Sequence, residues 1–94
     1  MKIGILTVIV YLGDTQSLKA KRSVLSPIIA RLHKAFNISV GEIDRQDVWN
    51  QGVLACVMVA NDTQFLQHAL ENIHTYIENQ WRNIEVVEYH VEIL

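Results

Sequence analysis

The fold of this chain is decided by residues 53–64, VLACVMVANDTQ. Val53–Ala60 is hydrophobic at every position, which predicts a strand that is buried on both faces and lies in the middle of a sheet. Asn61 follows at once and is predicted to cap a helix, with Gln64 three positions later completing a capping box. A central strand that leads directly into a helix indicates a domain that mixes both element types.

The residues after this unit predict an amphipathic helix and then an edge strand. The inward stripe of the helix consists of Phe65, Leu66, Ala69, Leu70, Ile73 and Ile77. From Ile84 to Leu94 polar and apolar residues alternate, with Val87, Tyr89, Val91 and Ile93 on one side and Glu88, His90 and Glu92 on the other. This alternation predicts a half-exposed strand whose charges protect a sheet edge.

The residues before the unit predict a strand, a helix and a further strand. Residues 2–12 are apolar on both faces and so predict a second central strand. Ser17 is the predicted N-cap of a helix that runs to about Phe36. Residues 38–43 predict the next strand, and a polar loop follows it.

Pro27 lies inside the first predicted helix. A proline has no N–H to donate to the carbonyl of Ser23, so we expect the helix to kink or to restart there, with Ser26 as a second cap. The first helical segment is then about two turns long.

The order of these elements is βαββαβ, with the first and third strands in the middle. This order predicts an α+β, ferredoxin-like fold in which a four-stranded antiparallel sheet carries two helices on one face. We expect a single domain over residues 1–94. The uncovered sheet face receives an apolar row such as Ile3, Ile5 and Ile9, so we expect a homodimer, or another partner, to pack on it.

Composition narrows the class of protein. Of the 94 residues, 50% are hydrophobic and 19% are charged, which is typical of a globular domain. The single cysteine, Cys56, lies in an apolar strand and has no partner for an internal disulfide, so we expect a reducing, cytoplasmic setting. The apolar runs are too short to span a bilayer, and no membrane partner is predicted.

The net charge of −2 conceals a basic segment. No carboxylate occurs between Thr15 and Gly41, yet five of the eight lysines and arginines lie there. Cations at the start of a helix disfavour it unless they share an anion with the free backbone N–H groups, so we predict a surface that binds an anion or RNA. The candidate residues are Ser17, Lys19, Lys21, Arg22, Arg31 and Lys34. The alternative is a solvated basic face that aids solubility.

The loop DRQDVWNQ, residues 44–51, holds the remaining candidates. Arg45 and an exposed Trp49 are predicted to contact a partner. For Trp49 we favour the alternative, a lid over one end of the core, because tryptophan is usually largely buried. Asp44 and Asp47 have no adjacent histidine or third carboxylate, so no metal site is predicted, and Asp44 is expected to fix the turn or to pair with Arg45.

No grouping of residues predicts a reaction. The four histidines are scattered and are expected to be ordinary surface residues, and neither a C-x-x-C motif nor a Gly-rich phosphate loop is present. The loop GDTQS after the first strand lacks the arginine that acylphosphatase activity requires. We therefore predict a protein that is not an enzyme and has no cofactor.

Three segments resemble the YlxP-like family of small bacterial proteins, a domain of unknown function (503). They are SLKAKR after the first strand, NISVGEIDRQDVWNQG, and the strand that ends in AND, and the similarity covers essentially the whole chain. The resemblance implies a ferredoxin-like fold and, because members are often encoded beside translation and ribosome-maturation genes, a link to ribosome assembly or RNA. The sequence departs from the family pattern at Arg45, where a histidine is common, at Gln51, where a basic residue is common, and before SLKAKR, where a proline is expected.

Three functions remain open. The first is a cytoplasmic binding module that contacts ribosomal RNA or ribosome-assembly intermediates through the basic helix. The second is a protein-interaction or oligomerisation subunit whose basic patch binds an acidic protein. The third is a sensor of a small anion or nucleotide.

Overall fold

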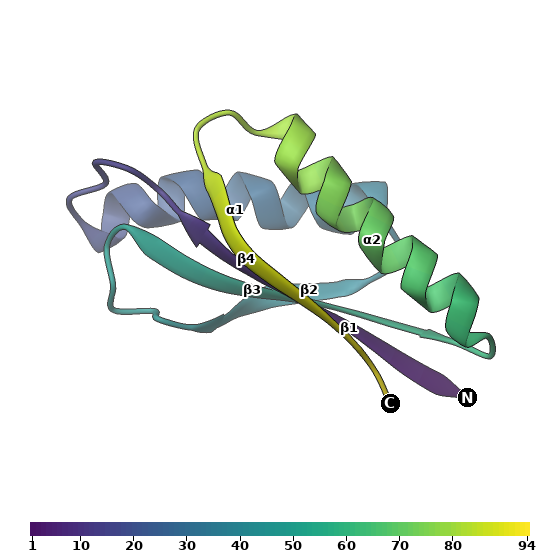
Figure 1. Ribbon diagram of the computed structural model, residues 1–94. Helices are drawn as coiled ribbons and strands as arrows, with labels where there is room; N and C mark the ends of the chain where they lie inside the picture. Colours follow the sequence, from purple (N-terminus) through teal and green to yellow (C-terminus); the bar gives the residue numbers. More distant parts are fainter.

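The computed structural model describes all 94 residues. Its elements follow the predicted order (Figure 1). They are β1 (Lys2–Tyr11), α1 (Leu18–Ala35), β2 (Ser39–Asp44), β3 (Gln51–Ala60), α2 (Thr63–Gln80) and β4 (Glu85–Ile93). All strand pairs are antiparallel and the strand order is β2-β3-β1-β4. The ferredoxin-like α+β fold and the central position of β1 and β3 are confirmed.

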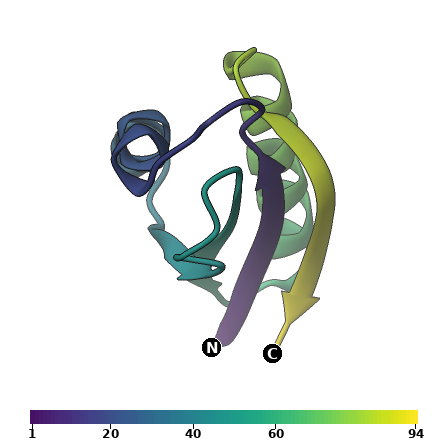
Figure 2. The ribbon, with the colours of Figure 1, turned by 90° about the vertical axis from the view of Figure 1, so that its left-hand side faces the viewer.

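The core lies between the sheet and the two helices. Alternate residues of β1 point into it, and Leu6, Val8 and Val10 are fully buried. The helices contribute Leu25, Ile28 and Leu32 from α1, and Leu66, Leu70, Ile73 and Ile77 from α2. Both helices lie on the same side of the sheet and leave the other face uncovered (Figure 1). The view in Figure 2 places α1 on the β2–β3 side and α2 on the β1–β4 side.

Two small residues show how closely the layers pack. A Cβ added at Gly4 of β1 would lie 2.8 Å from Leu70 Cδ1, so glycine allows α2 to approach the strand. Cys56 of β3 is fully buried, and this burial raises the pKa of its thiol to about 12. Cys56 is thus a free core residue, as predicted.

The ends of the helices agree only partly with the predictions. The Ser17 cap is confirmed, because its Oγ accepts a hydrogen bond of 3.0 Å from the backbone N–H of Ala20. The second helix is capped by Asp62, whose Oδ1 accepts from the N–H of Gln64 at 2.9 Å, and not by Asn61. Neither helix is long and apolar enough to cross a membrane.

The predicted restart of the helix at Pro27, with Ser26 as a second cap, is wrong, since α1 runs from Leu18 to Ala35 as one helix. Pro27 and Ser23 are both exposed, so water can replace the missing donor to the Ser23 carbonyl. Leu25 and Ile28 on either side of Pro27 are buried in one core and anchor both halves of the helix to it.

The predicted alternation of β4 fails at one residue. Ile9 pairs with Glu88 but Val10 pairs with Val86, so the register shifts and Val87 is the extra residue of a β-bulge. Val87 is exposed instead of pointing inward, and Val86 packs against the core in its place. A bulge and charged side chains on an edge strand both hinder further strand pairing.

Candidate functional site

The exposed face of α1 carries cations that form no ion pair. The helical period places Lys19 and Lys34 opposite the buried stripe and puts Arg22 and Arg31 on its two flanks, and all four are exposed. Neither ion pair of the molecule involves them, and the helix contains no Asp or Glu. Arg31 Nε donates to Tyr76 Oη of α2 at 3.0 Å. With a rise of about 1.5 Å per residue, the strip from Lys19 to Lys34 is about 22 Å long.

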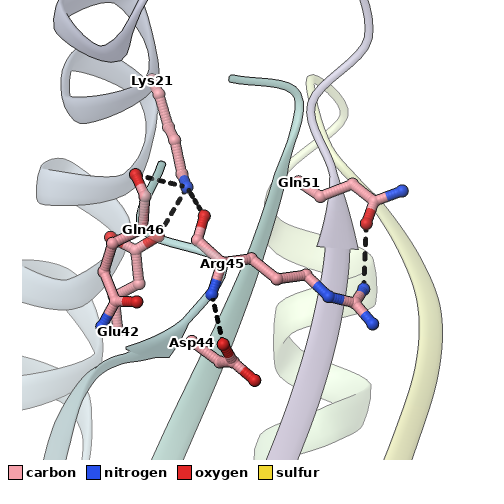
Figure 3. Close-up of polar contacts among 6 residues, drawn as sticks. All are labelled: Lys21, Glu42, Asp44, Arg45, Gln46 and Gln51. Atoms are coloured by element: carbon pink, nitrogen blue, oxygen red, sulfur yellow. Dashed lines mark hydrogen bonds and ion pairs between the residues drawn. The ribbon is translucent and has the colours of Figure 1, made fainter. Parts of the chain in front are cut away.

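Lys21 is not part of this strip, and its prediction as an anion-binding residue is wrong. Its side chain is only 2% exposed. Its Nζ lies 2.7 Å from Glu42 Oε2 and donates to the backbone carbonyl oxygens of Arg45, at 2.6 Å, and Gln46, at 3.4 Å (Figure 3). These three contacts occupy the ammonium, so it stabilises the fold and is not free to bind an external phosphate.

The inward position of Lys21 has a simple helical cause. Lys21 has the same spacing as the core residues that follow it on α1, namely Leu25, Ile28 and Leu32. The side chains of Lys21 and Glu42 are accommodated next to Gly52 of β3, where an added Cβ would lie 3.5 Å from Glu42 Oε2 and 3.7 Å from Lys21 Cε. The sequence therefore contained the spacing that indicates burial, but it did not show that Glu42, in another element, supplies the counter-charge.

The backbone of Arg45 turns the β2–β3 loop sharply. Arg45 has a positive φ of 58°, and its N–H donates to Asp44 Oδ1 at 2.7 Å, so Asp44 fixes the turn as predicted. Its carbonyl oxygen accepts from Lys21 and from the N–H of Val48, the latter at 3.0 Å. Its side chain leads away from α1 to Gln51, where Nη1 donates to Oε1 at 2.9 Å (Figure 3). The two loop residues that depart from the family pattern, Arg45 and Gln51, thus contact each other.

Trp49 is exposed, which contradicts the interpretation that it covers the core. Its side chain is 53% exposed and that of its neighbour Val48 is 39% exposed. The other tryptophan, Trp81, is half-buried and lies edge-on to Tyr76 with ring centroids 5.8 Å apart. Trp49 therefore remains a candidate for partner contact, on a loop that Lys21 holds in place.

A polar recess of about 230 Å³ separates the start of α1 from this loop. Its lining includes Arg22 and two carboxylates, Glu42 and Asp47. The start of α1 is therefore less basic in space than along the sequence, because the fold brings carboxylates of the loop beside it. Ser17 lies next to this recess in sequence, and its Oγ is already used as the helix cap.

A second polar cluster joins α2 to β4 and was missed in the sequence. His74, expected to be an ordinary surface histidine, is only 9% exposed. Its ring stacks on Tyr89 with centroids 3.5 Å apart, and its Nε2 lies 3.1 Å from Glu78 Oε1. Tyr89 Oη donates to Glu71 Oε2 at 3.1 Å, and this hydrogen bond, followed by the charge of Glu71, raises the pKa of Tyr89.

Neither polar cluster has the composition of a metal site. No group of three His, Cys, Asp or Glu side chains is placed to hold a metal ion. The only thiol is buried and its pKa is raised, so it is not activated as a nucleophile. The chemistry that the exposed side chains of α1 and the β2–β3 loop offer is that of binding, through cations and one indole ring.

Comparison with known proteins identifies the family. Residues 3–91 match the family described as "Protein of unknown function (DUF503)". The chain belongs to the DUF503 family. A relative in this family, the "Uncharacterized protein YlxP" of Bacillus subtilis (strain 168), is 32% identical over 66 residues, which are 70% of this chain and 72% of that protein. The resemblance to the YlxP-like family is thus confirmed.

Among solved structures, the DUF503 chain is similar to the crystal structure of protein SO0527 from Shewanella oneidensis. The match covers 97% of this chain and 88% of that one, with 17% sequence identity and a TM-score of 0.45. These names assign no activity to the DUF503 family.

Proposed function

We propose that this protein is a cytoplasmic binding module, not an enzyme, that contacts the phosphates of RNA through the exposed face of α1. The observation that carries the proposal is the strip of four exposed cations, Lys19, Arg22, Arg31 and Lys34, on a helix without any carboxylate. A strip of about 22 Å can follow several successive phosphates of one strand, since these are spaced more closely than that. Ribosomal RNA is the class of RNA that the family resemblance implies.

The residues have different roles in this proposal. Lys19, Arg22 and Lys34 provide charge to phosphate oxygens, and Arg31 does so from a position fixed by its hydrogen bond to Tyr76. Lys21 contributes only by holding the neighbouring loop. No aromatic side chain lies within the strip, so it offers no surface on which bases could stack. Its contacts would be to phosphates, which carry no sequence information, so we expect binding that is not sequence-specific.

The test is the salt dependence of RNA binding by paired variants. In K19Q/R22Q two cations of the strip are neutralised, and in the control K2Q/R82Q two exposed cations outside α1 are neutralised, with the same change in net charge. For a single strand, two lost phosphate contacts should lower the slope of log affinity against log salt by about 1.4. The control should keep the wild-type slope. Equal slopes for both variants, or no binding by the wild type at low salt, would overturn the proposal.

A protein partner with an acidic surface is the second candidate, and the exposed Trp49 beside Val48 favours it. Tryptophan and arginine are enriched among the residues that dominate protein interfaces. In this case Trp49→Ala should weaken binding by more than about tenfold. Because the indole is uncharged, the salt dependence should stay unchanged. A pull-down that compares Trp49→Ala with K19Q/R22Q separates the two candidates.

A further inference from the structure

The uncovered face of the sheet carries a continuous apolar surface. The two central strands place Ile3 beside Val59, Ile5 beside Val57 and Ile9 beside Val53, of which Val53 is only 6% exposed. In the middle of the two rows Thr7 and Ala55 are paired, so Thr7 is the only polar residue between Ile3 and Ile9 on this face. Neither helix covers the surface (Figure 1).

The size of this face matches what a stable dimer needs. Strands about 4.8 Å apart with residues about 3.4 Å apart give four strands of this length a projected area of roughly 600 Å². Because side chains protrude from the sheet, its accessible area is larger than this projected area. It approaches the roughly 800 Å² that each partner buries in a standard interface. The two central strands provide about half of this area as a contiguous apolar stripe, and an exposed apolar patch of a few hundred Å² often marks an interaction surface.

Charge distinguishes the two flanks of the apolar surface. On the β4 side, Glu88 is paired with Ile9 and Glu92 with Ile5, and His90 lies between them, so this flank is acidic. On the β2 side, Ser39 and Gly41 are paired with Val57 and Ala55 and carry no charge. The same side ends at the Asp44–Arg45 turn, from which the Arg45 side chain reaches Gln51.

We propose that a second copy of this chain packs on the uncovered face, with the two-fold axis parallel to the strands. This axis places β4 of one copy opposite β2 of the other and stacks β1 on β3. The alternative axis, perpendicular to the strands, would bring the two acidic β4 flanks together, and like charges across an interface are strongly unfavourable. The β2 flank ends in one carboxylate, Asp44, and one guanidinium, Arg45, so the proposed axis places the acidic β4 flank against a neutral flank instead of a second acidic one.

The register of the sheet predicts which charges meet. One row across the sheet, perpendicular to the strands, consists of Glu88 of β4, Ile9 of β1, Val53 of β3 and Asp44 of β2. Rotation about the proposed axis keeps this row at the same level, so Glu88 of one copy approaches the Asp44–Arg45 turn of the other, where the Arg45 guanidinium is the group that can pair with it. Both copies of α1 then lie on the outside of the pair, where their basic faces stay accessible.

The first test is the mass of the protein in solution, measured by sedimentation across the micromolar range. The wild type should sediment at twice the chain mass of 10.8 kDa. Ile5→Lys should be monomeric and still folded by circular dichroism, because the new lysine can pair with Glu92 in the adjacent strand. The control Phe65→Lys places the same charge at a 56% exposed residue of α2 and should remain dimeric. A monomeric wild type, or a dimeric Ile5→Lys, overturns the proposal.

The second test addresses the direction of the axis. Arg45→Glu and Glu88→Arg should each weaken the dimer about tenfold, because each places like charges opposite one another. The double variant R45E/E88R exchanges the two charges and should restore most of the lost affinity. If the two losses simply add, the proposed axis is wrong. Neither result depends on RNA, so these tests are independent of the RNA-binding proposal.

Discussion

The helices α1 and α2 have the same length, 18 residues, and occupy equivalent places in the fold, yet they reach the sheet in different ways. Most buried residues of both helices are aliphatic and follow the helical period. In α1, however, the first residue of the stripe is Lys21, and Pro27 lies within the helix. In α2 the polar residues that contact the sheet, His74 above all, lie at the margin of the stripe.

We expect burial, and not the number of polar contacts, to decide how much each polar cluster contributes to stability. The ammonium of Lys21 is 2% exposed, so its partners must replace all the water it has lost. Glu78, which lies beside His74, is 49% exposed and still hydrated. Removal of one partner should therefore lower the free energy of unfolding much more for the Lys21–Glu42 pair of α1 than for the His74–Glu78 pair of α2.

The largest effect is expected for Glu42→Ala. This substitution leaves the ammonium of Lys21 buried without its charged partner, which typically costs about 3–5 kcal/mol. Because the Glu42 side chain is 23% exposed, we expect a loss near 3 kcal/mol, at the lower end of that range. Urea denaturation monitored by circular dichroism measures it.

Two variants test whether the loss of stability comes from the unpaired charge of Lys21. The double variant K21M/E42L removes both charges and should lose less than Glu42→Ala alone, because apolar residues can replace a buried ion pair. The surface control Lys19→Met should change the free energy of unfolding by less than about 0.5 kcal/mol. A Glu42→Ala variant as stable as this control would contradict the comparison between the helices.

Pro27→Ala should have the second largest effect, and in the opposite direction. Alanine restores an N–H that can donate to the Ser23 carbonyl and is about 3 kcal/mol more favourable than proline within a helix. Without the proline ring the unfolded chain has more conformational entropy, which reduces this gain in the free energy of unfolding by up to about 1 kcal/mol. We expect the free energy of unfolding to rise by about 2 kcal/mol, measured by the same denaturation. A destabilised variant would show that Pro27 makes favourable contacts and does not weaken α1.

The caps of the two helices should contribute about equally, because both are exposed. Ser17→Ala and Asp62→Ala each remove one side-chain acceptor of a helix N–H, and each should lower the free energy of unfolding by about 1 kcal/mol. Paired urea denaturation curves measure the two values. A much larger loss at Ser17 would mean that the start of α1 also depends on the neighbouring loop through Lys21.

The sequence was sufficient to predict the fold because the pattern of apolar residues determines it. The unbroken hydrophobic run of Val53–Ala60 predicted a central strand, and the apolar stripe of α2 predicted its buried face except at Phe65, which is 56% exposed instead of pointing inward. Val87 was placed on the wrong side because a bulge is set by pairing with β1, which alternation along β4 does not reveal. The break expected at Pro27 failed because packing on both sides of a residue overrides its local preference.

The candidate site was less predictable because its polar residues depend on distant partners. Lys21 was grouped with Lys19 and Arg22 by sequence proximity, yet its counter-charge, Glu42, belongs to another element. The loop that carries the exposed Trp49 begins with a left-handed turn at Arg45, a conformation that the residue type does not favour. The exposure of Lys19, Arg31 and Lys34 was more predictable, because the helical period turns these residues away from the apolar stripe.

The smallest effect is expected at the α2–β4 cluster, where Tyr89→Phe keeps the ring that stacks on His74 and loses only the hydrogen bond to Glu71. That bond raises the pKa of Tyr89 above its ordinary value of 10.0, because a neutral phenol donates to the carboxylate and a phenolate would be repelled by it. A raised pKa in the folded state means that the stabilisation is complete below pH 10 and is lost as the pH rises through the folded-state pKa.

Wild type and Tyr89→Phe should therefore differ slightly in unfolding midpoint at neutral pH and converge in alkaline solution. An absorbance titration should also show that the most alkaline tyrosine is missing from the variant. If the midpoints stay apart after that tyrosine has ionised, the hydrogen bond to Glu71 is not the source of the difference. If Tyr89→Phe lost as much free energy of unfolding as Glu42→Ala, an exposed polar contact would contribute as much as a buried one. That result would contradict the contrast between α1 and α2.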